Sequence, residues 1–180
     1  MTAFWISQFL VVLAYFFLGI GLRKNDKIIL LYYSIIYQFL TMIQYLLLEG
    51  FVGVVSCVIG IVRNLVFINN ERRRINNPKW ILLLFAGFTI ILTAIFFSGL
   101  VDIFPCILTI LGIYIYWRGD MKTIRIGNIC ISICYIIYAI SLNSWMSIFC
   151  EGYVIINVIV GYFRDKNMKM IQKSKENRVE

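Results

Sequence analysis

The sequence predicts an all-α membrane protein with seven transmembrane helices, and three observations lead to this fold class. Hydrophobic residues make up 61% of the 180 residues and charged residues 14%, whereas soluble domains contain about 45–50% apolar and about 25% charged residues. The apolar residues form seven segments, each close to the ~20 helical residues that cross a hydrocarbon core of ~30 Å. The basic residues lie between alternate segments.

The seven segments account for most of the chain, so no separate soluble domain is expected. The first segment has no Lys or Arg before its apolar run and no small-x-small cleavage site after it, so a retained helix is expected rather than a signal peptide. The predicted helices span residues 3–22, 28–48, 51–70, 79–98, 100–117, 124–142 and 144–163.

The distribution of Lys and Arg predicts the orientation of the chain. Basic clusters follow the first, third, fifth and seventh segments, whereas the connections after the second, fourth and sixth segments contain no Lys or Arg. Because basic loops remain cytoplasmic, the N-terminus is expected outside and the C-terminus in the cytoplasm. An even number of helices would break this pattern. The topology also accounts for the net charge of +8, so the expected partner is the lipid bilayer and not nucleic acid.

An internal repeat is found when the chain is shifted against itself by 93 residues. This shift aligns segments one to three with segments five to seven, whereas a rival shift of about 101 residues, which pairs GIVR with GYFR, puts the segment ends out of step. Three helices are an odd number, so the extra fourth helix lets the second copy run in the same direction as the first. The identities are Tyr45 with Tyr138, Cys57 with Cys150, and Asn64 with Asn157.

The predicted architecture is therefore a 3+1+3 arrangement of parallel three-helix repeats. It divides the chain into a first repeat (1–70), a basic loop with a linker helix (71–98), a second repeat (99–164) and a basic cytoplasmic tail (165–180).

Arg63 and Asn64 are the most informative polar pair, because they lie in an apolar run. They share a helix face with small residues, which favours a position inside the helix bundle. Two interpretations of Arg63 remain open: it extends to the cytoplasmic headgroups or forms a structural pair, or it lines a polar path. Asn64 and its repeat mate Asn157 are expected to face one another across a pseudo-twofold axis and form a hydrogen-bonding pocket.

Glu151 is the other charged residue expected at depth in the membrane, about seven residues inside the seventh helix from its outer end. A proton-coupling role and a structural role are both open for it. Gln38 is a neutral hydrogen-bonding residue that either lines a cavity or joins helices. Glu49 and Asp102 are expected at the outer ends of helices, where water is available.

The same residues exclude several function classes. The chain has no histidine, and its five cysteines form no Cys-x-x-Cys pair, so no metal site, redox motif or cofactor is expected. A Ser-His or Cys-His catalytic pair and a phosphate-binding loop are also missing. The chain is therefore not expected to be an enzyme or to drive transport with ATP by itself.

The chain contains the run YLLLEGFVGVVSCVIGIVRNLVF at residues 45–67 and the run GYVIINVIVGYFR after Glu151. These and other short motifs resemble the bacterial inner-membrane family called YgjV-like, and the likeness covers nearly the whole chain. This family is similar in architecture to the SWEET and PQ-loop group, which implies a small-solute transporter in the cytoplasmic (inner) membrane. In SWEETs, asparagines on the third helix of each repeat line the sugar pocket, and Asn64 and Asn157 match them by position. The motifs are YLLLEGFVGVVSCVIGIVRNLVF (45–67), Gln8, Pro105 in FPCILTILG, Tyr138 in YIIYAI, and Glu151 before GYVIINVIVGYFR.

One feature departs from the SWEET pattern. SWEET helices carry several hinge prolines, whereas Pro105 is the only proline within a predicted span here. The resemblance therefore does not imply the same rocking motion.

Two functions remain after these exclusions. The first is a secondary transporter or facilitator of a small polar solute, with its site between the two repeats. The second is a non-transporting scaffold, subunit or immunity-type protein, whose polar residues join helices. A homo-oligomer is compatible with either. The substrate-binding residues expected for the first function are Asn64, Asn157, Arg63, Glu151 and Gln38.

Overall fold

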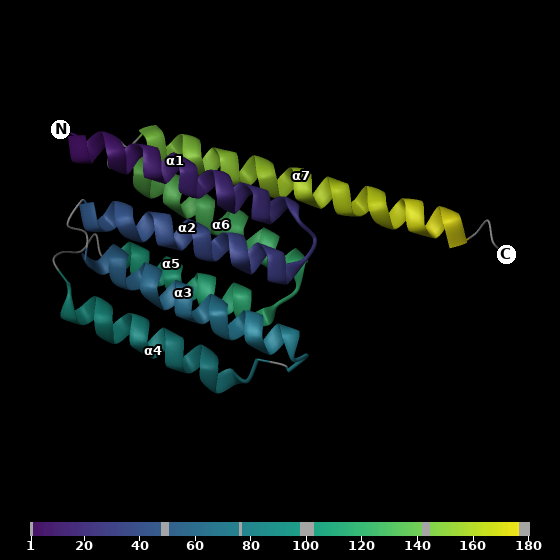
Figure 1. Cartoon of the computed structure of the whole chain (residues 1–180), viewed down its shortest axis with the longest axis horizontal. Coiled ribbons are helices and arrows are strands. Elements are labelled where there is room, and N and C mark those ends of the chain that lie inside the picture. Colours follow the sequence, from purple (N-terminus) through teal and green to yellow (C-terminus); the bar gives the residue numbers. More distant parts are fainter. Residues whose placement is uncertain (1, 48–50, 76, 98–102, 142–144, 177–180) are drawn as a thin grey trace.

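The computed structural model describes residues 2–47, 51–75, 77–97, 103–141 and 145–176, and these residues form helices without any strand (Figure 1). Successive helices run in opposite directions, so the odd-numbered helices share one direction (Figure 1). The helices are α1 (Thr2–Arg23), α2 (Lys27–Leu47), α3 (Phe51–Arg72), α4 (Lys79–Ile95), α5 (Ile103–Arg118), α6 (Met121–Ser141) and α7 (Trp145–Glu176).

Two tight turns start α2 and α6 in the same way. The Asp26 carboxylate accepts hydrogen bonds from the N–H groups of Ile28 (2.8 Å) and Ile29 (3.4 Å), which satisfies donors that a helix start leaves free. Asp120 accepts the Thr123 N–H at 2.9 Å. Hydrogen bonds from the Thr123 side chain and backbone lower the pKa of Asp120. The stabilisation from this cap is therefore present at neutral pH and is lost as the pH falls through that lowered pKa.

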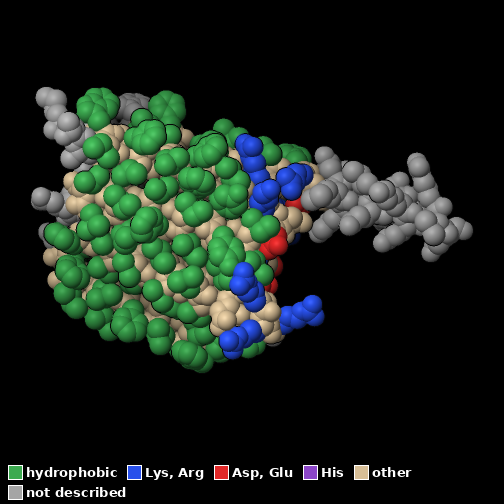
Figure 2. Space-filling view, in the orientation of Figure 1, with side chains coloured by type: hydrophobic (Ala, Val, Ile, Leu, Met, Phe, Trp, Pro, Cys, Tyr) green, Lys and Arg blue, Asp and Glu red, His purple; other side chains and the backbone are tan. Residues whose placement is uncertain are grey.

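Among the described residues, three helices are long and apolar enough to cross a membrane by length and composition. They are residues Trp5–Arg23 of α1, all of α2 and all of α3. The shorter apolar helices are α4 and residues Cys106–Arg118 of α5. Hydrophobic side chains cover most of the face shown in Figure 2, and Lys and Arg gather at one end of it. This end, which carries the α1–α2, α3–α4 and α5–α6 connections (Figure 1), is called the basic end below.

Six helices pack as a ring. Its neighbours in order are α1, α2, α3, α5, α6 and α7, and α7 closes the ring against α1. α4 lies outside this ring and packs against α3 and α5. The ring encloses an apolar core, and six of its fully buried members, one from each ring helix, lie toward the basic end: Leu22, Leu30, Phe67, Ile113, Ile124 and Val158. These six residues are called the apolar plug below.

The helix bounds follow the predicted segments closely, with one clear difference at α7. This helix continues to Glu176, whereas the apolar segment was predicted to end at residue 163. Many of the residues beyond residue 163 are charged or polar, so they do not continue the apolar segment. Lys, Met, Gln and Glu among them are nevertheless good helix formers. A search for apolar runs detects only the part of a helix that suits a membrane interior. Glu49 and Asp102, which were predicted at helix ends, lie outside the described residues.

Candidate solute site inside the helix ring

A cavity of about 150 Å³ lies inside the ring. Each of the six ring helices contributes to its lining, and α4 contributes no residue to it. Many of the lining side chains carry hydroxyl, amide or charged groups, so a polar pocket lies within an otherwise apolar bundle. The polar lining residues are Tyr15, Ser34, Tyr37, Gln38, Thr41, Tyr45, Ser56, Arg63, Thr109, Tyr116, Asn128, Ser132, Tyr135 and Glu151.

Arg63 lies against the wall of this cavity and its side chain is only 4% exposed. Its guanidinium carbon lies 4.8 Å from the centre of the Tyr116 ring on α5, a cation–π contact. Its Nη1 atom lies near Gly112, where an added Cβ would be 3.6 Å away. The guanidinium is therefore held inside the bundle and does not extend along the helix to its exposed end.

Asn64 orients this arginine. Its Oδ1 atom accepts hydrogen bonds from Arg63 Nε (3.1 Å) and Nη2 (2.9 Å), and its Nδ2 atom donates to Ser34 Oγ at 3.0 Å. Asn64 is fully buried and does not line the cavity. Both ends of its amide are used, so this residue links α2 to α3 and fixes the direction of the charged group beside it.

Glu151 brings the opposite charge to the same cavity. Its side chain is 4% exposed and accepts a hydrogen bond from the Tyr15 hydroxyl at 2.6 Å. Ser132 on α6 forms a second side-chain hydrogen bond with it. The Tyr15 ring packs edge-on against Tyr37, with 5.3 Å between the ring centres. Residues of α1, α2 and α6 therefore hold the carboxylate in place.

Gln38 and Ser56 carry buried polar atoms that no group in the described structure satisfies. These atoms are Gln38 Oε1 and Ser56 Oγ, and both residues line the cavity. The Gln38 amide lies against Gly60, where there is no room for a Cβ. An unsatisfied buried polar atom carries a penalty of about 1–3 kcal/mol. A bound polar molecule in this cavity would remove that penalty.

Asn157 lies elsewhere, although its repeat mate Asn64 adjoins the site. It is fully buried, does not line the cavity, and packs against Gly19 of α1, where an added Cβ would be 2.9 Å from Nδ2. Its Nδ2 donates to the Tyr153 carbonyl at 2.6 Å, and its Oδ1 has no partner among the described residues. Of the five residues predicted for the site, the structure thus brings Arg63, Glu151 and Gln38 to one cavity and places Asn64 and Asn157 in helix contacts.

The apolar plug lies on the side of the cavity that faces the basic end. Phe67 lies one helical turn beyond Arg63 in that direction and is fully buried. Toward the opposite end the lining continues to Tyr45 and Gly53, close to the end of α2 and the start of α3. The polar space is therefore displaced away from the basic end.

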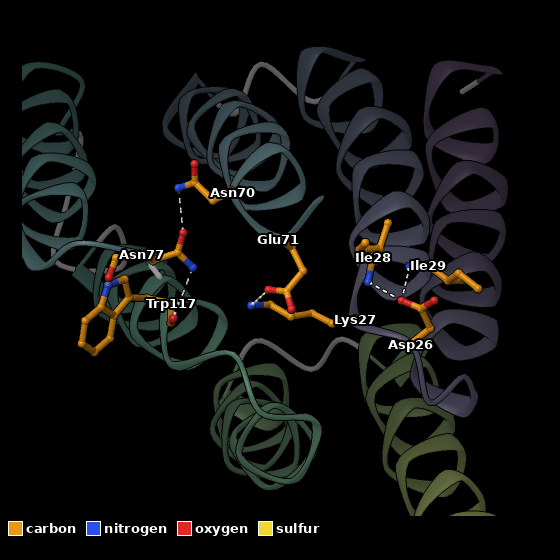
Figure 3. Close-up of polar contacts among 8 residues, drawn as sticks. All are labelled: Asp26, Lys27, Ile28, Ile29, Asn70, Glu71, Asn77 and Trp117. Atoms are coloured by element: carbon orange, nitrogen blue, oxygen red, sulfur yellow. Dashed lines mark hydrogen bonds and ion pairs between the residues drawn. The ribbon is translucent and has the colours of Figure 1, made fainter. Parts of the chain in front are cut away.

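Polar contacts at the basic end join the helices below the plug. Lys27 of α2 forms an ion pair with Glu71 of α3 at 2.7 Å. The side-chain oxygen of Asn77 accepts a hydrogen bond from the Asn70 amide, and the backbone carbonyl of Asn77 accepts one from the Trp117 indole N–H at 2.9 Å. Figure 3 shows Lys27 and Glu71 pointing toward each other and Asn77 between Asn70 and Trp117. α3 is thus tied to α2 directly and to α5 through Asn77.

Several cavity residues were not predicted from the sequence. Tyr15, Tyr116 and Ser132 hold the two charged groups, yet each belongs to a residue type that is common in membrane helices. Tyr116 lies near the end of α5, where aromatic residues commonly mark the membrane interface. No spacing within a single helix marks these residues, since each meets its partner across the ring.

A model of the family Imp-YgjV, described as "Bacterial inner membrane protein", matches residues 5–169. No curated protein and no solved structure matches the chain.

Proposed function

The chain belongs to the Imp-YgjV family of bacterial inner membrane proteins, and from this premise we propose that it is a secondary transporter or facilitator of a small polar solute. The proposed site is the cavity between the two groups of three helices, α1–α3 and α5–α7. The observation that carries the proposal is that two oppositely charged side chains, Arg63 and Glu151, are each 4% exposed and line one internal cavity.

The free energy needed to place these charges in the membrane is the reason to connect them with function. A charge near the bilayer centre costs about 2.5–3.5 kcal/mol on insertion scales, and such residues commonly mark solute or ion pathways. Small residues and neutral polar side chains join helices with a smaller free-energy penalty. The hydrogen bond between Asn64 and Ser34 joins α2 and α3 in this way. A protein that only needed stable packing would gain little from an arginine and a glutamate beside an internal space.

The packing order supports the proposed 3+1+3 repeat. A twofold relation between the two groups pairs the α3–α5 contact with the α7–α1 contact, and both occur in the ring. Gly112 of α5 lies against Arg63 of α3, and Gly19 of α1, which is 93 residues earlier, lies against Asn157 of α7. The equivalent helices therefore approach one another at equivalent glycines. Such an approach is expected when a duplicated three-helix unit packs against its copy.

The proposed topology places the basic end in the cytoplasm, with seven spans and the N-terminus outside. Support comes from the gathering of Lys and Arg at that end (Figure 2) and from the positive-inside rule. On this orientation the apolar plug closes the cytoplasmic side, and the cavity belongs to a state directed outward.

The competing function is a scaffold whose polar residues only join helices. Asn157 favours it locally, because this residue packs between α7 and α1. The two functions differ in whether water and small ions reach the cavity from outside.

Cysteine accessibility tests this difference. In a variant with the five native cysteines replaced, a single cysteine at Ser56 or Thr109 faces the cavity, and a cysteine at Leu65 or Leu83, which are 52% and 71% exposed on the outer surface, is the matched control. The transporter predicts that a small charged methanethiosulfonate reagent added outside intact cells modifies positions 56 and 109 and leaves 65 and 83 unmodified. Inert cysteines at both cavity positions would remove the basis for transport.

A further inference from the structure

The two charged residues of the cavity also indicate what kind of solute it takes. We infer that the solute is a small zwitterion, with its carboxylate near Arg63 and its ammonium group near Glu151. This inference rests on the proposed function and narrows it to a substrate class.

Arg63 lacks an anionic partner within the described structure. The ion pairs there are Lys27 with Glu71 and Arg125 with Asp165. The hydrogen bonds of Arg63 go to the neutral Asn64 amide, and its other contact is the Tyr116 ring. Neutral groups orient the guanidinium, but they do not cancel its charge.

Glu151 likewise has no cationic partner within the described structure, because no cation of the described residues forms an ion pair with it. Its carboxylate accepts hydrogen bonds from the neutral hydroxyls of Tyr15 and Ser132. A positive and a negative side chain therefore line one cavity without being paired to each other. Isolated buried charges are strongly unfavourable unless a countercharge approaches them.

A zwitterionic solute can compensate both charges at the same time, because it carries one negative and one positive group. A carboxylate can form charge-assisted hydrogen bonds with a guanidinium, and an ammonium group can donate to a carboxylate. A solute with one charge leaves one of the two side chains uncompensated, and an uncharged polyol leaves both. Gln38 Oε1 and Ser56 Oγ, which lack partners, offer further hydrogen bonds to a hydroxyl or amine of the solute.

The size of the cavity restricts the solute to a few atoms. Its volume is about 150 Å³, and an engineered cavity of about 150 Å³ in another protein accommodates benzene. A molecule such as serine has a comparable number of non-hydrogen atoms, whereas a hexose has about twice as many. The structure therefore favours a small amino acid over a sugar.

Four three-carbon solutes of nearly equal size separate the contributions of the two charges. Serine carries both charges, glycerate carries only the carboxylate, 2-amino-1,3-propanediol carries only the ammonium group, and glycerol carries neither. Uptake of each radiolabelled solute is measured in liposomes that contain the purified full-length protein and in protein-free liposomes. The uptake by protein-free liposomes is subtracted from each value. The remaining, protein-dependent uptake of serine is expected to exceed that of each of the other three solutes by at least about tenfold, equivalent to about 1.4 kcal/mol.

Charge-neutral variants assign each group to its residue. Arg63→Gln should reduce serine uptake by about tenfold and remove the preference for serine over 2-amino-1,3-propanediol. Glu151→Gln should remove the preference for serine over glycerate. Arg63→Lys keeps the charge and should retain the preference for a carboxylate even if Arg63→Gln fails to fold. Leu83→Ala on the outer face of α4 is the control and should transport serine as the native protein does.

The outcomes distinguish this inference from the proposed function. Equal uptake of all four solutes, or fastest uptake of glycerol or glycerate, would overturn the zwitterion assignment and leave a transporter of another class. Cavity cysteines that react with the external reagent, combined with no uptake of any of the four, would overturn the assignment in the same way. Unreactive cavity cysteines would overturn both.

Discussion

At the scale of single residues, the two asparagines show how far one residue type can differ in use. Asn64 and Asn157 occupy equivalent places in the proposed repeat, and both are fully buried. Asn64 uses both ends of its amide, whereas the Oδ1 atom of Asn157 has no partner among the described residues. The cost of removing a buried amide depends on what it leaves unsatisfied, so the two residues should respond differently to the same substitution.

We expect Asn64→Ala to lower the free energy of unfolding by about 1–3 kcal/mol, because it removes the acceptor of Arg63 and the donor to Ser34. Asn157→Ala should cost about 1 kcal/mol less, because it also removes an oxygen that is buried without a partner. Denaturant titration in detergent micelles gives both values. A larger loss for Asn157 than for Asn64 would contradict this assignment of their contacts.

The residues of the site were only partly predictable. An arginine, a glutamate and a glutamine within apolar segments are visible in the sequence because each is costly in a membrane, and these three line the cavity. The asparagines were predicted to face each other, and this prediction neglected local hydrogen bonds. Asn64 bonds to the adjacent Arg63, and Asn157 donates to the Tyr153 carbonyl one turn earlier in its own helix. The contacts of Tyr15 and Ser132 depend on ring closure, which no single segment encodes.

At the scale of the helices, α1 and α7 approach so closely that glycine is required at their contact. A Cβ at Gly161 would lie 2.7 Å from the carbonyl oxygen of Leu22, a backbone atom that cannot move aside easily. Gly152, on the same helix, has no atom within 4 Å of the equivalent position. One helix therefore contains a glycine fixed by packing and one that packing does not require.

Gly161→Ala is expected to reduce the free energy of unfolding by about 1–3 kcal/mol, since the two backbones must separate. Gly152→Ala should leave it unchanged or raise it by up to about 1 kcal/mol, because alanine favours helix more than glycine does. The pair is compared in the same detergent by thermal or denaturant unfolding. Equal effects of the two substitutions would show that α1 and α7 are further apart than described.

Arg125 of α6 joins three helices at the basic end. It is 4% exposed, donates to the carbonyl of Lys24 at 3.1 Å and to that of Leu22 at 3.4 Å, and forms an ion pair with Asp165 of α7. The Leu22 carbonyl belongs to the C-terminal turn of α1, where helix acceptors lack partners within the helix, and Lys24 directly follows that helix. Arg125 therefore caps α1 while it holds α7.

Arg125→Met should destabilise the protein by about 3–5 kcal/mol, because it leaves the Asp165 carboxylate without its cation and the two backbone carbonyls without their donor. Adding Asp165→Asn should recover part of the loss, since the unpaired charge is then removed as well. A double-mutant cycle on the free energy of unfolding measures the coupling. Additive losses in the double variant would argue against a direct ion pair.

At the scale of the whole molecule, the helix ring combines a polar cavity with an apolar plug. The sequence predicted the helices and their approximate bounds well, because apolar length is a property of each segment alone. It did not predict the neighbours around the ring or the filling of one half by apolar side chains. Those depend on shape complementarity between segments that are far apart in the chain.

The proposed orientation predicts the outcome of reporter fusions. Alkaline phosphatase fused after Leu47 should be active, because this end of α2 is expected outside, and the same enzyme fused after Glu180 should be inactive. A fluorescent protein, which requires the cytoplasm to fold, should give the reverse pattern at the two positions. An active phosphatase at Glu180 would reverse the topology and, with it, the direction assigned to the cavity.

The position of α4 outside the ring has a consequence for the evolution of this protein. The helix supplies no wall of the pocket, and Leu83, Ile91 and Ile95 on its surface are 58–71% exposed. Selection on such a helix acts on its hydrophobicity and its length, and only weakly on the identity of each side chain. Among homologous genes we therefore expect α4 to diverge faster in sequence than the six helices of the ring.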